Sequence, residues 1–197
     1  NFDKNKKIEL KKEDVQELID CFNKKDLSNA EMLAEKLNIE FPDSFFIYYM
    51  MALIKENQKN TDLALKYYNK SIELNPKYSE AYNNLGNLYR QRGDYEKAIN
   101  NYKQAIHFNN NFFIAYYNLG NSFKNIGKLS EAKENFKKAL SIKPDFIESY
   151  NSLGDIFLIS GNINNALEMF LIGTGFVRFN SDKSGIEILN KKNNEKN

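Results

Sequence analysis

The sequence has few of the residues from which the common reaction centres are built. Its 197 residues include one cysteine and one histidine. Cys21 has no partner for an internal disulfide, and its place on the apolar side of an expected helix favours a small buried hydrophobe over a nucleophile. His107 lies among asparagines on the polar side of another expected helix, so neither a Ser-His-Asp nor a Cys-His arrangement has support. We therefore expect no catalytic residues and no enzymatic activity.

Motifs for metals and cofactors are also missing. No group of histidine, cysteine and acidic residues has the spacing of a metal site. The segment Gly173-Thr174-Gly175 lacks the lysine of a phosphate-binding loop. The sequence therefore predicts neither a metal nor a cofactor.

Charge and hydropathy exclude two further classes of partner. The formal net charge is only +2, and the lysines are spread along the chain, which does not indicate a nucleic-acid partner. No apolar run approaches the roughly 18 residues of a membrane span, and the lysine-rich start shows no signal peptide. With only 3 prolines the chain is also compatible with helices. We expect a soluble, cytoplasmic protein with neither nucleic acid nor membrane as partner.

What the sequence does contain is a pattern that recurs every 34 residues. Its three best copies are Tyr82, Leu85, Gly86, Tyr89, Gly93, Ala98, Tyr102 and Ala105, then Tyr116, Leu119, Gly120, Phe123, Gly127, Ala132, Phe136 and Ala139, then Tyr150, Leu153, Gly154, Phe157, Gly161, Ala166 and Phe170. On a helix, the first four members of each copy fall within one narrow arc, which indicates a buried face. The glycine in that arc predicts close approach of a neighbouring helix, and the second glycine predicts a left-handed turn between two helices.

This pattern resembles the tetratricopeptide repeat family, whose signature has an aromatic residue, Leu-Gly, a second aromatic and Ala-x3-aromatic at the same period. The resemblance implies an all-α fold, a right-handed superhelical solenoid of antiparallel helix pairs, with about ten helices in about five repeats. We place the repeats at residues 11–44, 45–78, 79–112, 113–146 and 147–180, after a frayed lead-in at 1–10. The first is divergent and the second is degraded, with Met51-Ala52 in place of Leu-Gly.

The end of the chain abandons the pattern, which leaves two interpretations of residues 181–197 and the segment before them. Gly173 and Gly175 predict that the last helix ends there. The β-favouring runs 176–179 and 186–189 flank six turn-forming residues and favour a hairpin. A capping helix from Asp182 to Lys192, the common solution in the family, is the alternative. In either case we expect this segment to cap the last repeat, followed by a polar tail.

The side of each first helix opposite the buried face is expected to remain free when the repeats stack. In the family this face forms a concave groove in which extended peptides bind. The candidate peptide-binding residues on it are Asn83, Asn84, Asn87, Arg90, Tyr117, Asn118, Asn121, Lys124 and Asn151. Asparagine amides both donate and accept hydrogen bonds, so they can pair with successive peptide groups. The row resembles the asparagine ladder of O-linked N-acetylglucosamine transferases, although the high asparagine content of the whole chain would also produce it.

The functional hypothesis is therefore a protein-protein interaction scaffold that binds another protein or an extended peptide segment in this groove. The alternative is a targeting or substrate-recruiting module of a larger enzyme such as a transferase. A carboxylate clamp for an acidic C-terminus is unlike this sequence, because Asn83, Glu148 and Ser152 stand where that clamp needs cations. No particular oligomeric state is indicated.

Overall fold

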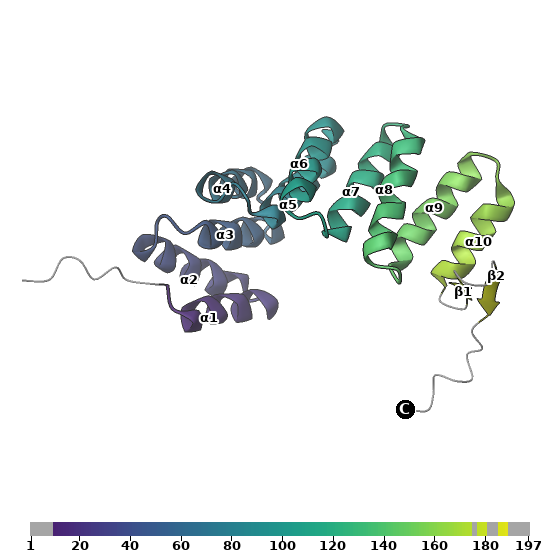
Figure 1. Cartoon of the computed structure of the whole chain (residues 1–197). Coiled ribbons are helices and arrows are strands. Elements are labelled where there is room, and N and C mark those ends of the chain that lie inside the picture. Colours follow the sequence, from purple (N-terminus) through teal and green to yellow (C-terminus); the bar gives the residue numbers. More distant parts are fainter. Residues whose placement is uncertain (1–9, 175–176, 181–184, 189–197) are drawn as a thin grey trace, which may run out of the picture. The chain divides into compact units, whose positions relative to one another are not determined.

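A computed structural model describes residues 10–174, 177–180 and 185–188. Ten helices and one two-stranded sheet lie in this part of the chain (Figure 1). The helices are α1 Lys12–Asn23, α2 Leu27–Glu40, α3 Phe45–Asn57, α4 Thr61–Leu74, α5 Ser79–Gln91, α6 Tyr95–Phe108, α7 Phe113–Asn125, α8 Leu129–Ile142, α9 Ile147–Ile159 and α10 Ile163–Gly173. The expected all-α architecture of antiparallel helix pairs is confirmed.

The chain divides into two compact units, residues 1–88 and residues 89–197, and each has its own hydrophobic core. In the first unit, α3 packs against both α4 and α2, and its core includes Leu18, Ala34, Ile47 and Met50. The aromatic and methionine-rich start of α3 therefore belongs to the core. In the second unit, α7 packs between α6 and α8, α9 packs between α8 and α10, and the core is built around Tyr102 and Phe136.

The second helix of most pairs starts at a side-chain cap that recurs with the repeat. The carboxylates of Asp26 and Asp94 and the amide oxygens of Asn60 and Asn162 each accept a hydrogen bond from the backbone N–H three residues later. Such a cap satisfies one of the backbone donors that the first turn of a helix leaves unpaired. Lys128 occupies the equivalent place before α8 and makes no such bond. The start of each second helix is thus encoded locally at four of five positions.

The turn inside each pair uses a residue in the left-handed region of backbone conformation. Gly93, Gly127 and Gly161 have φ of +78°, +76° and +73°, which confirms the expectation for these glycines. Two lysines, Lys25 and Lys59, adopt φ of +61° at the equivalent positions of the first two repeats. The turn geometry is therefore kept in the divergent repeats even where the glycine is not.

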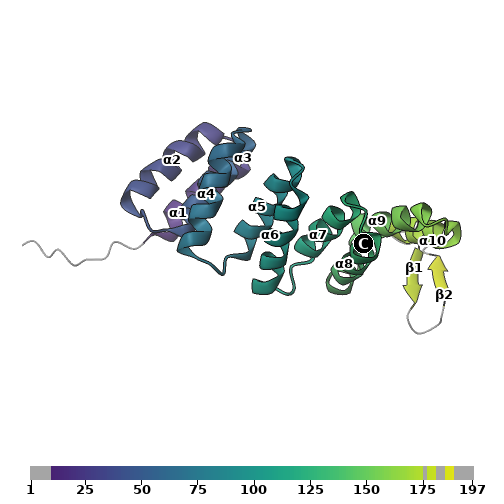
Figure 2. The ribbon, with the colours of Figure 1, turned by 90° about the horizontal axis from the view of Figure 1, so that it is seen from above.

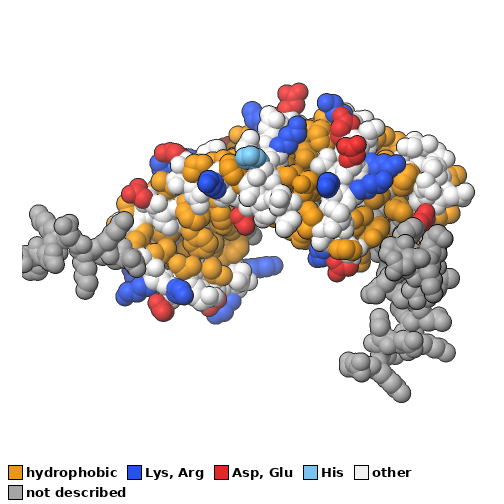
Figure 3. All heavy atoms as spheres, in the orientation of Figure 1, with side chains coloured by type: hydrophobic (Ala, Val, Ile, Leu, Met, Phe, Trp, Pro, Cys, Tyr) orange, Lys and Arg blue, Asp and Glu red, His pale blue; other side chains and the backbone are white. Residues whose placement is uncertain are grey.

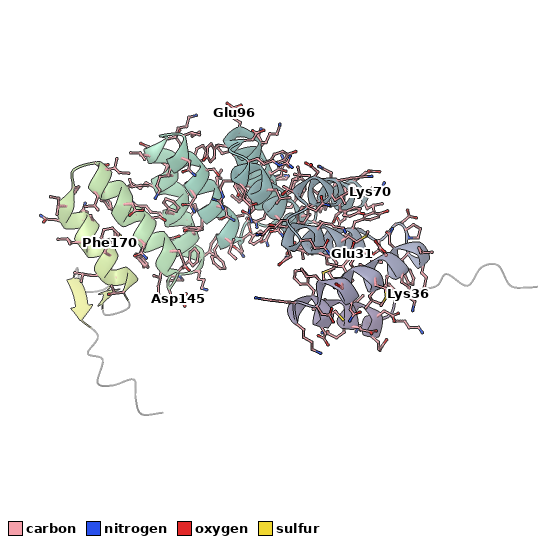
Figure 4. All side chains as sticks on the ribbon, turned by 180° about the vertical axis from the view of Figure 1, so that it is seen from behind. Glu31, Lys36, Lys70, Glu96, Asp145 and Phe170 are labelled. Carbon is pink, nitrogen blue, oxygen red and sulfur yellow. The ribbon has the colours of Figure 1, made fainter. Side chains whose placement is uncertain are left out.

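Two glycines of the buried face allow an aromatic ring to lie directly on the helix backbone. A Cβ atom added at Gly120 would lie 2.7 Å from Cε1 of Phe136, and one added at Gly154 would lie 2.5 Å from Cε1 of Phe170. Phe170 is labelled in Figure 4 on the final helix pair. The predicted close approach is thus confirmed at both positions, and the group that makes it is the ring on the second helix of the pair.

The C-terminal segment forms the hairpin rather than the capping helix. Strand β1 (Val177–Asn180) pairs antiparallel with β2 (Gly185–Ile188), with Val177 opposite Ile188 and Asn180 opposite Gly185 (Figure 2). Helix α10 ends at Gly173, as expected, and contacts β1. The lead-in at 1–9 and the tail after residue 188 lie outside the described residues.

Candidate functional site

In the second unit, the free side of α7 and α9 brings together polar residues that are one repeat apart. The ammonium group of Lys124 on α7 lies 2.8 Å from Oδ2 of Asp155 on α9, and both side chains remain partly exposed. Asn121 lies one turn before Lys124 and is half-buried. Within the described residues, its side-chain amide takes part in no hydrogen bond. The ion pair shows that the free sides of successive first helices lie next to each other here.

Tyr117 marks the aromatic edge of this face. Its ring meets that of Phe146, the residue before α9, edge-on at 5.1 Å, and it lies 5.7 Å from the ring of the buried Phe136. The Lys143 ammonium lies 5.8 Å from the centre of the Phe146 ring. Such contacts hold the ring of Tyr117 in place, and the residue remains half-buried.

Asn83 and Asn118 differ from the expectation that the asparagine row is exposed, because they are only 5% and 8% exposed. The physical reason is that a first helix has neighbours on both flanks. With about 100° of rotation per residue, Asn118 lies on one flank of its helix and Tyr117 on the other, whereas Asn121 lies between the flanks. Burial of the flanks therefore narrows the face that a partner can reach.

In the first unit, Asn84 is likewise engaged by a neighbouring first helix. Its side-chain amide donates a hydrogen bond of 3.1 Å to the Tyr49 hydroxyl on α3, and its Oδ1 accepts one of 3.1 Å from the Asn83 amide. Burial raises the pKa of Tyr49, so the hydroxyl keeps its proton. Asn84 thus joins two first helices, and Asn87, between the flanks, is half-buried.

Arg90 was expected on the free face but turns toward the interior of its own pair. Its side chain hydrogen-bonds with Tyr102 of α6. Desolvation nevertheless raises the pKa of Tyr102 to about 12, so the phenol is neutral. Arg90 occupies the same place in the repeat as Lys124, so the contact with Tyr102, and not the helical position, distinguishes its structural role from that of Lys124.

Asn151 is exposed at the start of the free side of α9. Its Oδ1 lies 2.7 Å from the position that a Cβ atom of Gly173 would occupy. The glycine therefore lets the end of α10 approach this part of α9. Asp155, which was not among the expected contact residues, could have been found from its place exactly one period after Asn121.

The other residues considered in the sequence are not part of this face. Cys21 is a half-buried free thiol that packs against the core of the first unit. His107 is exposed, and its pale-blue side chain is visible on the surface in Figure 3. Within the described residues, no group of three or more histidine, cysteine or acidic side chains could hold a metal ion. No helix in the same part of the chain has both the length and the hydropathy to cross a membrane.

Comparison with known families gives a consistent result. Tetratricopeptide repeat models match residues 45–78 and 113–146, residues 67–100, and residues 86–127. These matches run without a break from residue 45 to residue 146, which is more than half of the 197 residues.

Two curated relatives match a shorter segment. Photosystem I assembly protein Ycf3 of Rippkaea orientalis is 34% identical over 61 residues, 31% of this chain and 35% of the relative. Ycf3 of Cyanophora paradoxa is 35% identical over 52 residues, 26% of this chain and 30% of the relative. The chain thus spans about a third of the length of these relatives.

Solved structures match nearly the whole chain in fold. A crystal structure of MamA aligns with a TM-score of 0.73 and 24% identity, covering 85% of this chain and 95% of that one. PilF of Pseudomonas aeruginosa aligns with a TM-score of 0.75 and 19% identity, covering 81% and 74%. YrrB, described as a protein of this repeat type with an unusual peptide-binding site, aligns at 0.69 and 17% identity, covering 87% and 89%. At these identities the likeness concerns the fold alone.

Proposed function

The chain belongs to the tetratricopeptide repeat family and is a scaffold for protein-protein interaction, and we propose that it binds an extended segment of another protein without catalysing a reaction. The proposed contact surface in the second unit is the free side of α7 and α9, with Tyr117, Asn121, Lys124, Asn151 and Asp155. The observation that carries it is the Lys124–Asp155 ion pair, which aligns the free sides of two successive first helices.

The chemistry of this face favours recognition of the peptide backbone. Asn121 can donate to a peptide carbonyl and accept from a peptide N–H at the same time. Lys124 and Asp155 neutralise each other, so the face lacks the excess positive charge that would select an acidic C-terminus. We therefore expect an extended segment with little net charge, held by main-chain hydrogen bonds and by stacking on Tyr117.

The first unit offers a smaller surface of the same kind. Asn87 lies between the flanks of α5, as Asn121 does on α7, whereas Asn83 and Asn84 support it through their bonds to each other and to Tyr49. In this proposal Asn83, Asn84 and Asn118 position the face, and Asn87 and Asn121 contact the ligand. The name of the Ycf3 relatives, which refers to assembly of a protein complex, agrees with a scaffold role.

The test uses a displayed library of short unstructured peptides as the source of ligand. A selected peptide is then titrated against the protein and against the double variant Asn121→Ala/Lys124→Ala. Loss of the Asn121 hydrogen bond, about 1 kcal/mol, together with the unpaired Asp155 carboxylate that Lys124→Ala leaves on the face, predicts a loss of affinity of at least about fivefold. Gln104→Ala, an exposed amide side chain on the second helix α6 and away from the free side of α7, is the matched control and should bind normally.

Circular dichroism of all variants checks that the fold is intact. A selected peptide that binds the double variant as tightly as the wild type would show that this face is not the binding site.

A further inference from the structure

In the second unit, a lysine of the chain itself lies over a group of aromatic rings. The Phe146 ring is edge-on to the rings of Phe113 and Tyr117, at 5.0 and 5.1 Å between centres. The Lys143 ammonium lies 5.0 Å from the centre of the Phe113 ring and 5.8 Å from that of Phe146. Both distances are within the roughly 6 Å at which the face of an aromatic ring attracts a cation. We call Phe113, Tyr117 and Phe146 the second triad.

The first unit contains an equivalent group of rings two 34-residue periods earlier, which we call the first triad: Phe45, Tyr49 and Tyr78. The Tyr78 ring is edge-on to both other rings, at 4.9 Å between centres in each contact. Asn75 takes the place of Lys143. Among the described residues, no lysine or arginine lies over a ring of the first triad. The first triad therefore has the ring arrangement of the second without its cation.

The two triads differ in the side chain at this position and not in the backbone. Asn75 follows the last residue of α4 with φ −136° and ψ 88°, and Lys143 follows the last residue of α8 with φ −127° and ψ 90°. The amide oxygen of Asn75 accepts a 3.2 Å hydrogen bond from the backbone N–H of Lys77. The short side chain is thus used in the turn, whereas the longer lysine at the same place reaches the rings.

A carboxylate without a counter-ion lies beside the first triad. Glu80 accepts a 2.9 Å hydrogen bond from the Ser79 hydroxyl, and it forms no ion pair in the part of the chain that the structure describes. Burial raises the pKa of both Tyr49 and Tyr78, and the negative charge of Glu80 raises each further, so the carboxylate is close to both hydroxyls. Glu80 and the three rings are half-buried, which leaves part of each in contact with solvent.

We propose that the first triad and Glu80 bind a lysine side chain of a partner protein. The ammonium lies over the rings as Lys143 lies over the second triad, and Glu80 neutralises its charge. Aromatic faces and a carboxylate both favour a cation over a neutral side chain of the same length. Tyr49 takes the place in its repeat that Tyr117 takes at the edge of the proposed contact surface. The inference thus rests on the proposed function and names one residue of a bound segment.

The probe comes from a displayed library of peptides in which one fixed lysine is flanked on both sides by random residues. Peptides that also bind the variant Asn75→Lys, in which the chain supplies its own lysine, are removed before selection on the full wild-type chain. The selected peptide and a version with methionine in place of the lysine are then titrated by fluorescence anisotropy. Because methionine is of similar length but uncharged, its peptide should bind about tenfold more weakly.

Three variants locate the site, with circular dichroism as a check of the fold. Glu80→Gln should weaken the lysine peptide by about threefold or more, whereas Glu35→Gln, at an exposed carboxylate of α2, should not. Asn75→Gln replaces the same asparagine without adding a charge and should bind normally. If no peptide survives the removal step, or if the methionine peptide or Glu80→Gln binds as tightly as its parent, the proposal is overturned. The surface on α7 is tested with its own peptide and double variant, so such a result leaves the proposed function standing.

Discussion

Adding one methyl group at Gly120 tests the close packing that defines each helix pair. The Cβ atom of Gly120→Ala would lie 2.7 Å from Cε1 and 2.9 Å from Cδ1 of Phe136, whereas carbon atoms prefer about 3.5–4.0 Å. Phe136 is 0% exposed, so its ring has no solvent to move into. The ring, or the whole helix α8, must give way.

Two opposing effects set the size of the change. Alanine stabilises a helix interior by about 1 kcal/mol relative to glycine. Overpacking of a filled core costs about 1–3 kcal/mol, and the fully enclosed ring places this site near the upper end. We therefore expect Gly120→Ala to lower the free energy of unfolding by about 1–2 kcal/mol. At this chain length that corresponds to a melting temperature lower by roughly 4 °C.

Urea unfolding followed by circular dichroism measures the change in the free energy of unfolding. A variant with a smaller side chain at position 136 supplies the control. In a Phe136→Leu background the clash is removed, so Gly120→Ala should become stabilising by about 1 kcal/mol through helix propensity alone. Gly154→Ala offers a second comparison. Its Cβ would lie even closer to a ring, 2.5 Å from Phe170, but Phe170 is half-buried and can move outward, so the cost should be smaller than at Gly120. Stabilisation by Gly120→Ala in the wild-type background would refute the packing argument.

Two further predictions concern the first unit. Burial raises the pKa of Glu56, which accepts a 2.7 Å hydrogen bond from the Tyr68 hydroxyl, so the folded state binds this proton more tightly than the unfolded state. The wild type should therefore gain stability relative to Glu56→Gln as the pH falls from about 7 to about 5; equal urea midpoint differences at both pH values would contradict this. Lys59→Gly removes a left-handed lysine and should stabilise the protein by about 0.5–1 kcal/mol, whereas Lys66→Gly, inside α4, should destabilise it by about 1 kcal/mol. Differential scanning calorimetry of both variants decides the point, and a lower melting temperature for Lys59→Gly would show that the turn tolerates lysine without strain.

The sequence predicted the repeat well because its signals are local. The start of a second helix depends on one capping side chain, such as Asp94, and its preceding turn depends on one residue, such as Gly93, that accepts a positive φ. Gly120 and Phe136 recur at fixed places in the period, so their close contact could also be expected. The hairpin was predicted from β propensity and turn residues, which again act over short distances.

The sequence was less informative where the environment comes from another helix. Lys25 and Lys59 adopt the left-handed turn although their residue type disfavours it, because the packed helices on either side fix the chain there. Only the position of these lysines in the 34-residue period, and not their residue type, indicated the left-handed conformation.

The same distinction between local signals and contacts with other helices applies to the candidate site. From the pattern of a single helix, the sequence by itself determined that Asn121 and Asp155 lie opposite the buried stripe. Only the tertiary structure decided that Asn118 is buried, that Arg90 bonds to Tyr102, and that Lys124 pairs with Asp155. The physical reason is that a helix period fixes direction around one axis, whereas burial of the two flanks depends on how closely the helices of the neighbouring repeats approach.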